Sequence, residues 1–287
     1  MRYPVSAAVH LARQHLHSAA FLFLAVITLA GCARATPAPA TASAPSTADV
    51  LRPVPAPRSA YDDLSVETQA LQDDPFANPG LLWVDQGREL WADESRGPSC
   101  ASCHTGEGAA HPLATAVTRY PRLDPQGGGL INLTQQINRC RTERQQLPKL
   151  PYESEPLLAL TTYLKSLARG EPVTLTAEPD LLPYLLRGEA YYYERRGQMN
   201  LACHHCHERH VGQLLRGDRL SQGLGNGYPA YRLEWQTLVS LHRRLRLCNT
   251  GIRAEPFAYG AQAYLALELY LKWRARGLLH ETPAVRR

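Results

Sequence analysis

Methionine is scarce in this chain of 287 residues, where only Met1 and Met199 occur. The chain therefore offers almost no thioether sulfur that could ligate a metal. Long apolar runs are also rare, since no stretch after Cys32 reaches the roughly 18 apolar residues of a membrane-spanning helix. The chain also lacks the basic residues interleaved with aromatics that nucleic acid-binding modules use, so we expect no nucleic acid partner.

Size and charge indicate an ordinary globular protein. Hydrophobic residues make up 44% of the chain, and its length by itself suggests about two domains. The formal net charge is +5 when the histidines are neutral, which favours anionic partners. Seven cysteines are present, and their spacing carries most of the functional information.

The first 31 residues are typical of a lipoprotein-type signal peptide. Arg2 and Arg13 supply positive charge, and an apolar stretch ends at Leu29-Ala30-Gly31-Cys32. This string resembles a bacterial lipobox, so we expect cleavage before Cys32 and lipidation of Cys32. The alternative is ordinary signal cleavage near this point, with Cys32 incidental.

Residues 32–60 are rich in Ala and Pro and predict a flexible tether. A tether directly after a lipidated cysteine lets a folded domain stand off a membrane. We therefore expect a periplasmic protein whose contact with a membrane is limited to the lipid anchor on Cys32.

Two short strings share the pattern C-x-x-C-H: Cys100-Ala101-Ser102-Cys103-His104 and Cys203-His204-His205-Cys206-His207. This pattern attaches a c-type haem, because two thiols one helical turn apart bond to the two vinyl groups of one porphyrin. The histidine that follows becomes the proximal ligand of the iron. One match alone could be a redox C-x-x-C, but two matches disfavour that alternative. We expect two haem c groups, attached through Cys100, Cys103, Cys203 and Cys206 and ligated by His104 and His207.

The second half of the chain repeats the first. Residues 158–170 and 265–277 agree at most positions, and their separation in sequence is nearly the same as that of the two haem strings. Such self-similarity indicates a tandem duplication. We therefore predict an all-α fold with two cytochrome c-like domains, residues 61–173 and 174–287, each with one haem.

Helical patterns flank each haem string. Residues 87–91 and 188–193 precede the strings and carry aromatics toward the haem. Residues 155–169 and 262–276 follow them and show apolar positions at helical spacing. Prolines and glycines punctuate the stretches between, and no alternating pattern of a β-strand stands out.

Cys140 and Cys248 remain once the other cysteines are assigned. They occupy equivalent places in the two repeats, between the haem string and the closing helix. A disulfide between them is the alternative that export suggests. However, a disulfide requires Cα atoms within about 7 Å, and equivalent places in separate domains are poor partners for it.

Distal ligation of the haem irons is the better role for both cysteines, because the sixth ligand of small c-type domains comes from this region. Met199 lies four residues before Cys203, too close in sequence to cross easily to the distal face. We predict Cys140 as the distal ligand of the first haem and Cys248 as that of the second, where His242 competes. Thiolate ligation lowers the potentials, the first indication of chemistry beyond electron transfer.

Four arginines surround Cys248: Arg243, Arg244, Arg246 and Arg253. If residues 241–248 are helical, Arg244 lies one turn before Cys248 on the same face. A nearby guanidinium stabilises a thiolate and binds an oxyanion bidentately. The alternative is that these arginines clamp haem propionates or form a solvated surface.

These residues resemble the SoxA family, the dihaem subunits of the SoxAX cytochromes that start thiosulfate oxidation. The resemblance extends from about Asn78 to the C-terminus. Its most specific segments are Asn78-Pro79-Gly80, Ile137-Asn138-Arg139-Cys140-Arg141, Gly227-Tyr228-Pro229-Ala230-Tyr231-Arg232 and Cys248-Asn249-Thr250-Gly251-Ile252-Arg253-Ala254-Glu255-Pro256. The lipobox and the long tether depart from the usual family pattern.

The resemblance implies an L-cysteine S-thiosulfotransferase. Such an enzyme joins thiosulfate oxidatively to a cysteine thiol of SoxY in the SoxYZ carrier, and two electrons leave through haem to an acceptor cytochrome c. Cys140 and Cys248 match the family's distal ligands. Cys248 also matches the catalytic residue, often a persulfide, and Arg244 matches the residue that contacts the substrate. A SoxX-like cytochrome c subunit would complete a heterodimer.

Two other functions stay open at this point. A dihaem cytochrome c that only carries electrons in the periplasm would use Cys248 as a ligand and nothing more. A dihaem peroxidase would need an opened haem and usually a haem of higher potential with His and Met ligands. The shortage of methionine disfavours the peroxidase.

Overall fold

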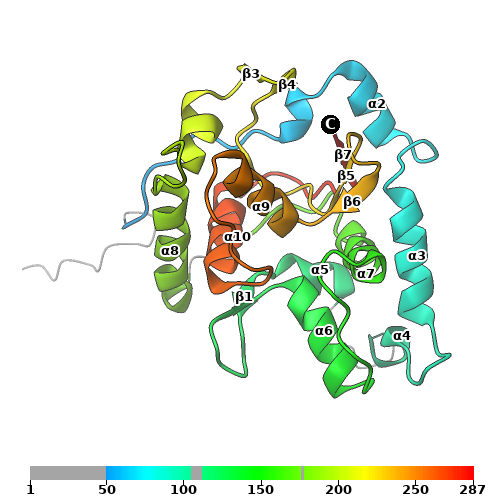
Figure 1. The fold of residues 1–287 in the computed structure, drawn as a ribbon. Coiled ribbons are helices and arrows are strands. Elements are labelled where there is room, and N and C mark those ends of the chain that lie inside the picture. The colour runs from blue at the N-terminus through cyan, green and yellow to red at the C-terminus, as the bar shows by residue number, and fades with distance from the viewer. Residues whose placement is uncertain (1–49, 105–111, 176–177) are drawn as a thin grey trace, which may run out of the picture. The chain divides into compact units, whose positions relative to one another are not determined.

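The computed structural model describes residues 50–104, 112–175 and 178–287. The expected signal peptide and the lipidation site Cys32 lie outside these residues. The described part is mainly helical (Figure 1). None of its helices has the length and apolar character to cross a membrane.

Two helix pairs form the framework. Helix α3 (Leu81–Ala92) packs against α7 (Glu155–Ser166), and α8 (Leu182–Tyr193) packs against α10 (Gln262–Arg274) (Figure 1). In each pair the first helix precedes a haem string and the second closes the repeat. These four helices confirm the four helical segments that the sequence predicts.

A glycine allows each pair to approach closely. A Cβ added to Gly87 would lie 2.2 Å from the carbonyl oxygen of Ala159, and one added to Gly188 would lie 2.2 Å from that of Ala266. Real Cβ atoms do not approach so closely, so only glycine fits at either crossing. Because both crossings place equivalent residues together, the duplication in the sequence is also present in the packing.

The remaining helices precede the pairs or lie in the chain between the paired helices. Their N-termini are capped by side chains where the sequence allows: Asn132 and Gln135 form a capping box on α6, and Ser240 accepts from the backbone N–H of Arg243 on α9. The elements are η1 (Ala60–Asp63), α2 (Val66–Asp73), α4 (Cys100–His104), α5 (Leu113–Thr118), α6 (Leu133–Glu143), η2 (Pro179–Leu181), the π-helical turn η3 (His205–Arg209) and α9 (Leu241–Gly251).

Three small sheets among the described residues correct the prediction of an all-α fold to a mainly helical one. Two are antiparallel pairs, and the third has the order β6-β5-β7, with β5 antiparallel to β6 and parallel to β7. Strands of two or three residues are too short to show an alternating pattern, so no local signal marks them in the sequence. The strands are β1 (Arg122–Leu123), β2 (Leu130–Ile131), β3 (Leu214–Leu215), β4 (Asp218–Arg219), β5 (Ala230–Arg232), β6 (Thr237–Val239) and β7 (Ala284–Arg286).

Each repeat has its own apolar core. One core gathers residues of α5, α6 and α7, and the other gathers residues of α8, α9 and α10. Contacts between the repeats tie the two cores together, since the Gln262 amide of α10 both donates to and accepts from the backbone of Leu130 on β2, at 2.9 and 3.0 Å. The two repeats are therefore packed against each other.

The chain just before η1 lies on the second repeat. Leu51 is 3% exposed, and the backbone N–H of Arg52 donates to Glu189 Oε1 at 2.8 Å. Gln222 bonds to the backbone of both Ala56 and Arg58. Within the tether expected for residues 32–60, residues 50–59 thus contact the folded part of the chain.

Candidate functional site

Helix α9 presents Arg244 and Cys248 together. It spans Leu241–Gly251, so the condition under which Arg244 lies one turn before Cys248 on the same face is met. Residues four apart share a helix face, and the Arg244 guanidinium accordingly interacts with the Cys248 sulfur. Both side chains are partly buried.

Cys248 has a lowered pKa although its surroundings are largely desolvated. Burial raises the pKa of this thiol, but a hydrogen bond with His207 and the positive charges of Arg244 and Arg232 lower it by more. The net result is a pKa below the usual range of a cysteine. A thiolate, which is the nucleophilic form of cysteine and its metal-ligating form, is therefore favoured here.

Arg232 is a second cation at this place, and the sequence did not single it out. It lies on β5 with 8% of its surface exposed, and its Nε has no hydrogen-bond partner among the described residues. Burial lowers its pKa, and the charge of Arg244 lowers it further, whereas the charge of Cys248 raises the pKa of Arg244. The two guanidinium groups and the Cys248 sulfur therefore lie close enough to change one another's pKa values.

The other three arginines near Cys248 have different partners. Arg243 lies over the Trp235 ring at 5.3 Å, and Arg246 donates to the Phe257 carbonyl. Arg253 donates to Gln198 at 3.4 Å and is exposed. The surface role considered for these residues fits this arrangement better than a role beside the sulfur.

The His207 ring is held from two sides. Its Nδ1 lies 2.8 Å from the Ser221 carbonyl oxygen, which can only accept, so Nδ1 carries the proton. Nε2 is then the nitrogen left for Cys248 or for an iron. Gly223 packs so closely on the ring that an added Cβ would lie 2.7 Å from it. The ring orientation is thus fixed by packing and by a hydrogen bond, as metal-ligating histidines require.

The two cysteines of the second haem string, Cys203 and Cys206, lie near Cys248. The negative charge of Cys248 raises the pKa of Cys203 and Cys206, after the larger effect of burial, and the pKa of Cys203 reaches about 12. His207 and Cys248 face each other, and the two thiols lie beside them. This set of donors is the one that a covalently attached haem with two axial ligands requires, so the residues fit haem c.

The structure brings only part of the first haem string close to its predicted distal ligand, Cys140. Cys100 interacts with Cys140 of α6, and both sulfurs accept from glutamines, Cys140 from Gln136 at 3.2 Å and Cys100 from Gln145 at 3.7 Å. His104 and Cys103 are exposed, and residues 105–111 lie outside the described residues. The Trp91 ring lies 5.3 Å from that of His104, so α3 carries an aromatic toward the haem string as predicted.

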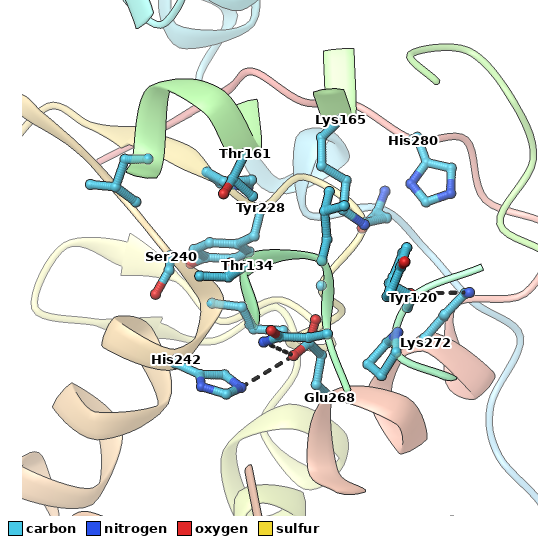
Figure 2. A pocket seen from close by; sticks show the side chains of 18 of the residues that line it. Tyr120, Thr134, Thr161, Lys165, Tyr228, Ser240, His242, Glu268, Lys272 and His280 are labelled. Atoms are coloured by element: carbon cyan, nitrogen blue, oxygen red, sulfur yellow. Dashed lines mark hydrogen bonds and ion pairs between the residues drawn. The ribbon is translucent and has the colours of Figure 1, made fainter. Parts of the chain in front are cut away.

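His242, the competing ligand, lies elsewhere. Its Nδ1 accepts from the backbone N–H of Gly260 at 3.1 Å, and its Nε2 lies 3.1 Å from Glu268 Oε2 (Figure 2). Both ring nitrogens therefore have partners away from Cys203 and His207. Met199 is 52% exposed. Cys140 and Cys248 are both free thiols, so the alternative of a disulfide between them does not occur.

Comparisons with known proteins find matches over most of the chain. The SoxA/TsdA cytochrome c domain model matches twice, at residues 86–173 and 187–279. The L-cysteine S-thiosulfotransferase subunit SoxA of Pseudaminobacter salicylatoxidans is 40% identical over 223 residues, 77% of each chain. The SoxA subunit of Paracoccus pantotrophus is 36% identical over 221 residues, 76% of this chain and 75% of that one.

A solved structure extends the similarity to three dimensions. A chain of the crystal structure of SoxXA from P. pantotrophus superposes with a TM-score of 0.75 at 35% identity, covering 80% of this chain and 87% of that one. The repeated haem strings, the free cysteines and the long matches lead to one conclusion. The chain belongs to the SoxA family, the cytochrome c subunits of L-cysteine S-thiosulfotransferase.

Proposed function

We propose that this chain joins thiosulfate to a carrier cysteine at the sulfur of Cys248. The observation that carries the proposal is the convergence of Arg244, Arg232 and His207 on that sulfur. A plain electron carrier needs an axial ligand but has no use for two guanidinium groups beside it. The same convergence therefore favours sulfur transfer over electron transfer alone.

The chain would hold two haem c groups. Cys203 and Cys206 would attach the second haem, with His207 and Cys248 as axial ligands. Cys100 and Cys103 would attach the first, with His104 and Cys140 as axial ligands. Haem supplies an acceptor for single electrons, and each group would lie in one repeat, residues 61–173 and 174–287.

Thiosulfate fits the charges at Cys248. Its sulfonate oxygens carry negative charge, and guanidinium groups bind such oxygens in a planar, bidentate manner. With the sulfonate on Arg244 and Arg232, the outer sulfur would reach Cys248 Sγ. The two arginines repel each other when nothing lies between them, so the binding of a dianion relieves that repulsion.

The reaction divides into two steps at Cys248. In the first, the Cys248 thiolate and the outer sulfur of thiosulfate form an S–S bond and release two electrons. In the second, the thiolate of the carrier cysteine attacks that outer sulfur and the Cys248 thiolate leaves. The carrier then has a cysteine S-thiosulfonate, one proton has gone to solvent from its thiol, and Cys248 is regenerated. The two electrons leave to an acceptor cytochrome c.

The proposal includes partners and a location. The carrier would be SoxY in a SoxYZ complex, and a SoxX-like cytochrome c would form a heterodimer with this chain. The site of action would be the periplasm, with membrane attachment through a lipid on Cys32. Detection of the lipid by intact mass of the purified protein would test that anchor.

Replacement of Cys248 tests the proposed function. The Cys248→Ala holoprotein should retain both covalent haems, measured by mass, and lose thiosulfate-dependent formation of the carrier thiosulfonate. Leu247→Ala is the matched control, because Leu247 is an exposed neighbour on the same helix. Full activity of Cys248→Ala with both haems attached would overturn the proposal.

A further inference from the structure

A cavity of about 70 Å³ lies between the two repeats, apart from the group around Cys248. It is bordered by α7, by α10 and by the start of α9, and none of its lining residues belongs to either predicted haem site. A water occupies about 10–15 Å³ in this measure. The cavity therefore has room for several waters or for one small polyatomic ion with a water beside it.

Two lysines border this cavity from equivalent positions. Lys165 of α7 and Lys272 of α10 occupy the same place in the duplicated closing helices. Figure 2 shows both side chains in the wall of the cavity. The chain has only one other lysine, the exposed Lys149, so lysines are concentrated here. The packing of the repeats has thus brought two like charges to one cavity.

Of the two carboxylates that line the cavity, only one acts on the charges of the lysines. Glu153 of the first repeat also lines the cavity, but it accepts from the backbone N–H of Ser240 at 3.3 Å and does not alter the pKa of either lysine. The carboxylate that acts on both lysines is Glu268 of α10, the counterpart of Thr161 on α7. That carboxylate accepts from His242 at 3.1 Å and from Asn132 at 3.2 Å. Lys272 donates instead to two backbone carbonyls, those of Thr118 and Tyr120, which carry no net charge.

A buried polar atom without a partner faces the same cavity. His280 is 6% exposed, and its Nε2 makes no hydrogen bond to any described residue. Asn226 Oδ1, which also lines the cavity, likewise has no partner among the described residues. Buried polar atoms are almost always paired, so such groups indicate something polar inside the cavity.

We propose that this cavity is a binding site for a small inorganic oxyanion of the size of sulfate, held between Lys165, Lys272 and His280. The negative charge of the anion would lie against two ammonium groups, and its oxygens would accept a hydrogen bond from Nε2 of a neutral His280. A water beside the anion would donate to Asn226 Oδ1. The site needs neither haem nor Cys248, so it does not depend on the proposed function.

The pKa values of the cavity groups show how burial and like charge act on the two lysines. Burial, and then the charge of Lys165, lowers the pKa of Lys272 to about 7. Burial also lowers the pKa of Lys165, against the opposing effect of Glu268. For His280, burial and both lysines lower the pKa to about 3, so the ring is neutral at pH 7. A bound anion would favour the charged form of both lysines.

Equilibrium dialysis of the holoprotein against radiolabelled sulfate tests the proposal. Arg244→Gln serves as the background, because Arg244 is itself proposed to bind an oxyanion. We expect one sulfate per chain in this background. Its affinity should fall about tenfold or more after Lys165→Met or Lys272→Met, because each variant loses a charge-assisted hydrogen bond. Lys149→Met is the matched control and should bind as the background does.

Crystals of the holoprotein with selenate give a second measurement that needs no variant. Selenate has the shape and charge of sulfate, and its anomalous signal should appear between Lys165, Lys272 and His280. A cavity that holds only water, or one filled by a haem propionate in the holoprotein, would show no selenate. Either result, or equal sulfate affinity in the background and both lysine variants, overturns the proposal.

Discussion

Arg244 and Cys248 lie on one face of α9, and each changes the pKa of the other. The Arg244 charge helps to lower the pKa of Cys248, and the charge of the sulfur raises the pKa of Arg244. Arg232 reaches the same sulfur from β5, a different part of the second repeat. The local helix thus supplies one cation, and the tertiary fold supplies the other.

Replacement of Arg244 should weaken substrate binding. We expect Arg244→Gln to lower kcat/KM for thiosulfate by about 10- to 100-fold, mainly through KM, because a hydrogen bond to a charged group is worth roughly 1.5–3 kcal/mol. Steady-state kinetics with the carrier protein measure this. Arg246→Gln on the same helix is the control, since Arg246 bonds to the Phe257 carbonyl. Equal losses in the two variants would show that α9 as a whole was disturbed.

Arg232 should act together with Arg244. We expect Arg232→Gln to lower kcat/KM for thiosulfate as well, and the double variant to lose less than the product of the two single losses, because both contact one dianion. Arg253→Gln, an exposed change in the same region, should have little effect. If the loss of kcat/KM in the double variant equals the product of the two single losses, the two guanidinium groups do not contact the same dianion.

The helix crossings should tolerate nothing larger than glycine. In Gly188→Ala the new methyl would collide with the Ala266 carbonyl, and such overpacking costs about 1–3 kcal/mol of the free energy of unfolding. Gly251→Ala is the control, because an added Cβ there meets nothing within 4 Å. Thermal unfolding followed by circular dichroism compares the two variants, and equal Tm values would contradict the assigned crossing.

Lys272 should make stability depend on pH. Its pKa is about 7 in the folded chain and about 10.4 in an unfolded one. Between these values the unfolded state binds more protons, so the contribution of Lys272 to stability rises with pH from about 7 to about 10 and is constant below about 7.

Urea unfolding of the parent chain and of Lys272→Met, in a buffer without oxyanions, isolates this contribution. The difference in unfolding free energy should change in favour of the parent chain as the pH rises through that range. Saturating sulfate should reduce the pH dependence, since a bound anion keeps Lys272 charged. A difference that does not vary with pH would contradict the lowered pKa.

The helices and the placement of Cys248 beside Arg244 were predictable from the sequence for identifiable reasons. The helices that close the repeats carry apolar positions at helical spacing, and the duplication fixes which residues are equivalent. Cys248 stands out because methionine is scarce in the chain and because arginines surround it in the sequence. These features can be predicted from a single sequence because they are local or repeated patterns.

Other features depend on contacts between distant segments. The strands β5, β6 and β7 are very short, and β7 comes from the end of the chain to pair with β5, so no local pattern reveals this sheet. Arg232 of β5 and Arg244 of α9 interact although they lie on different elements, which only the tertiary fold determines. The cavity is lined by residues of both α7 and α10, so it depends on the tertiary fold, although Lys165 and Lys272 were visible as equivalent residues in the repeat.

The most direct test of the account is mass spectrometry of the Cys248 peptide after the oxidised holoprotein reacts with thiosulfate and no carrier is present. We expect a thiosulfate adduct on Cys248, absent in Arg244→Gln at low thiosulfate and removed when the carrier thiol is added. An adduct that forms on another residue, or turnover without any adduct on Cys248, would contradict sulfur transfer at this cysteine.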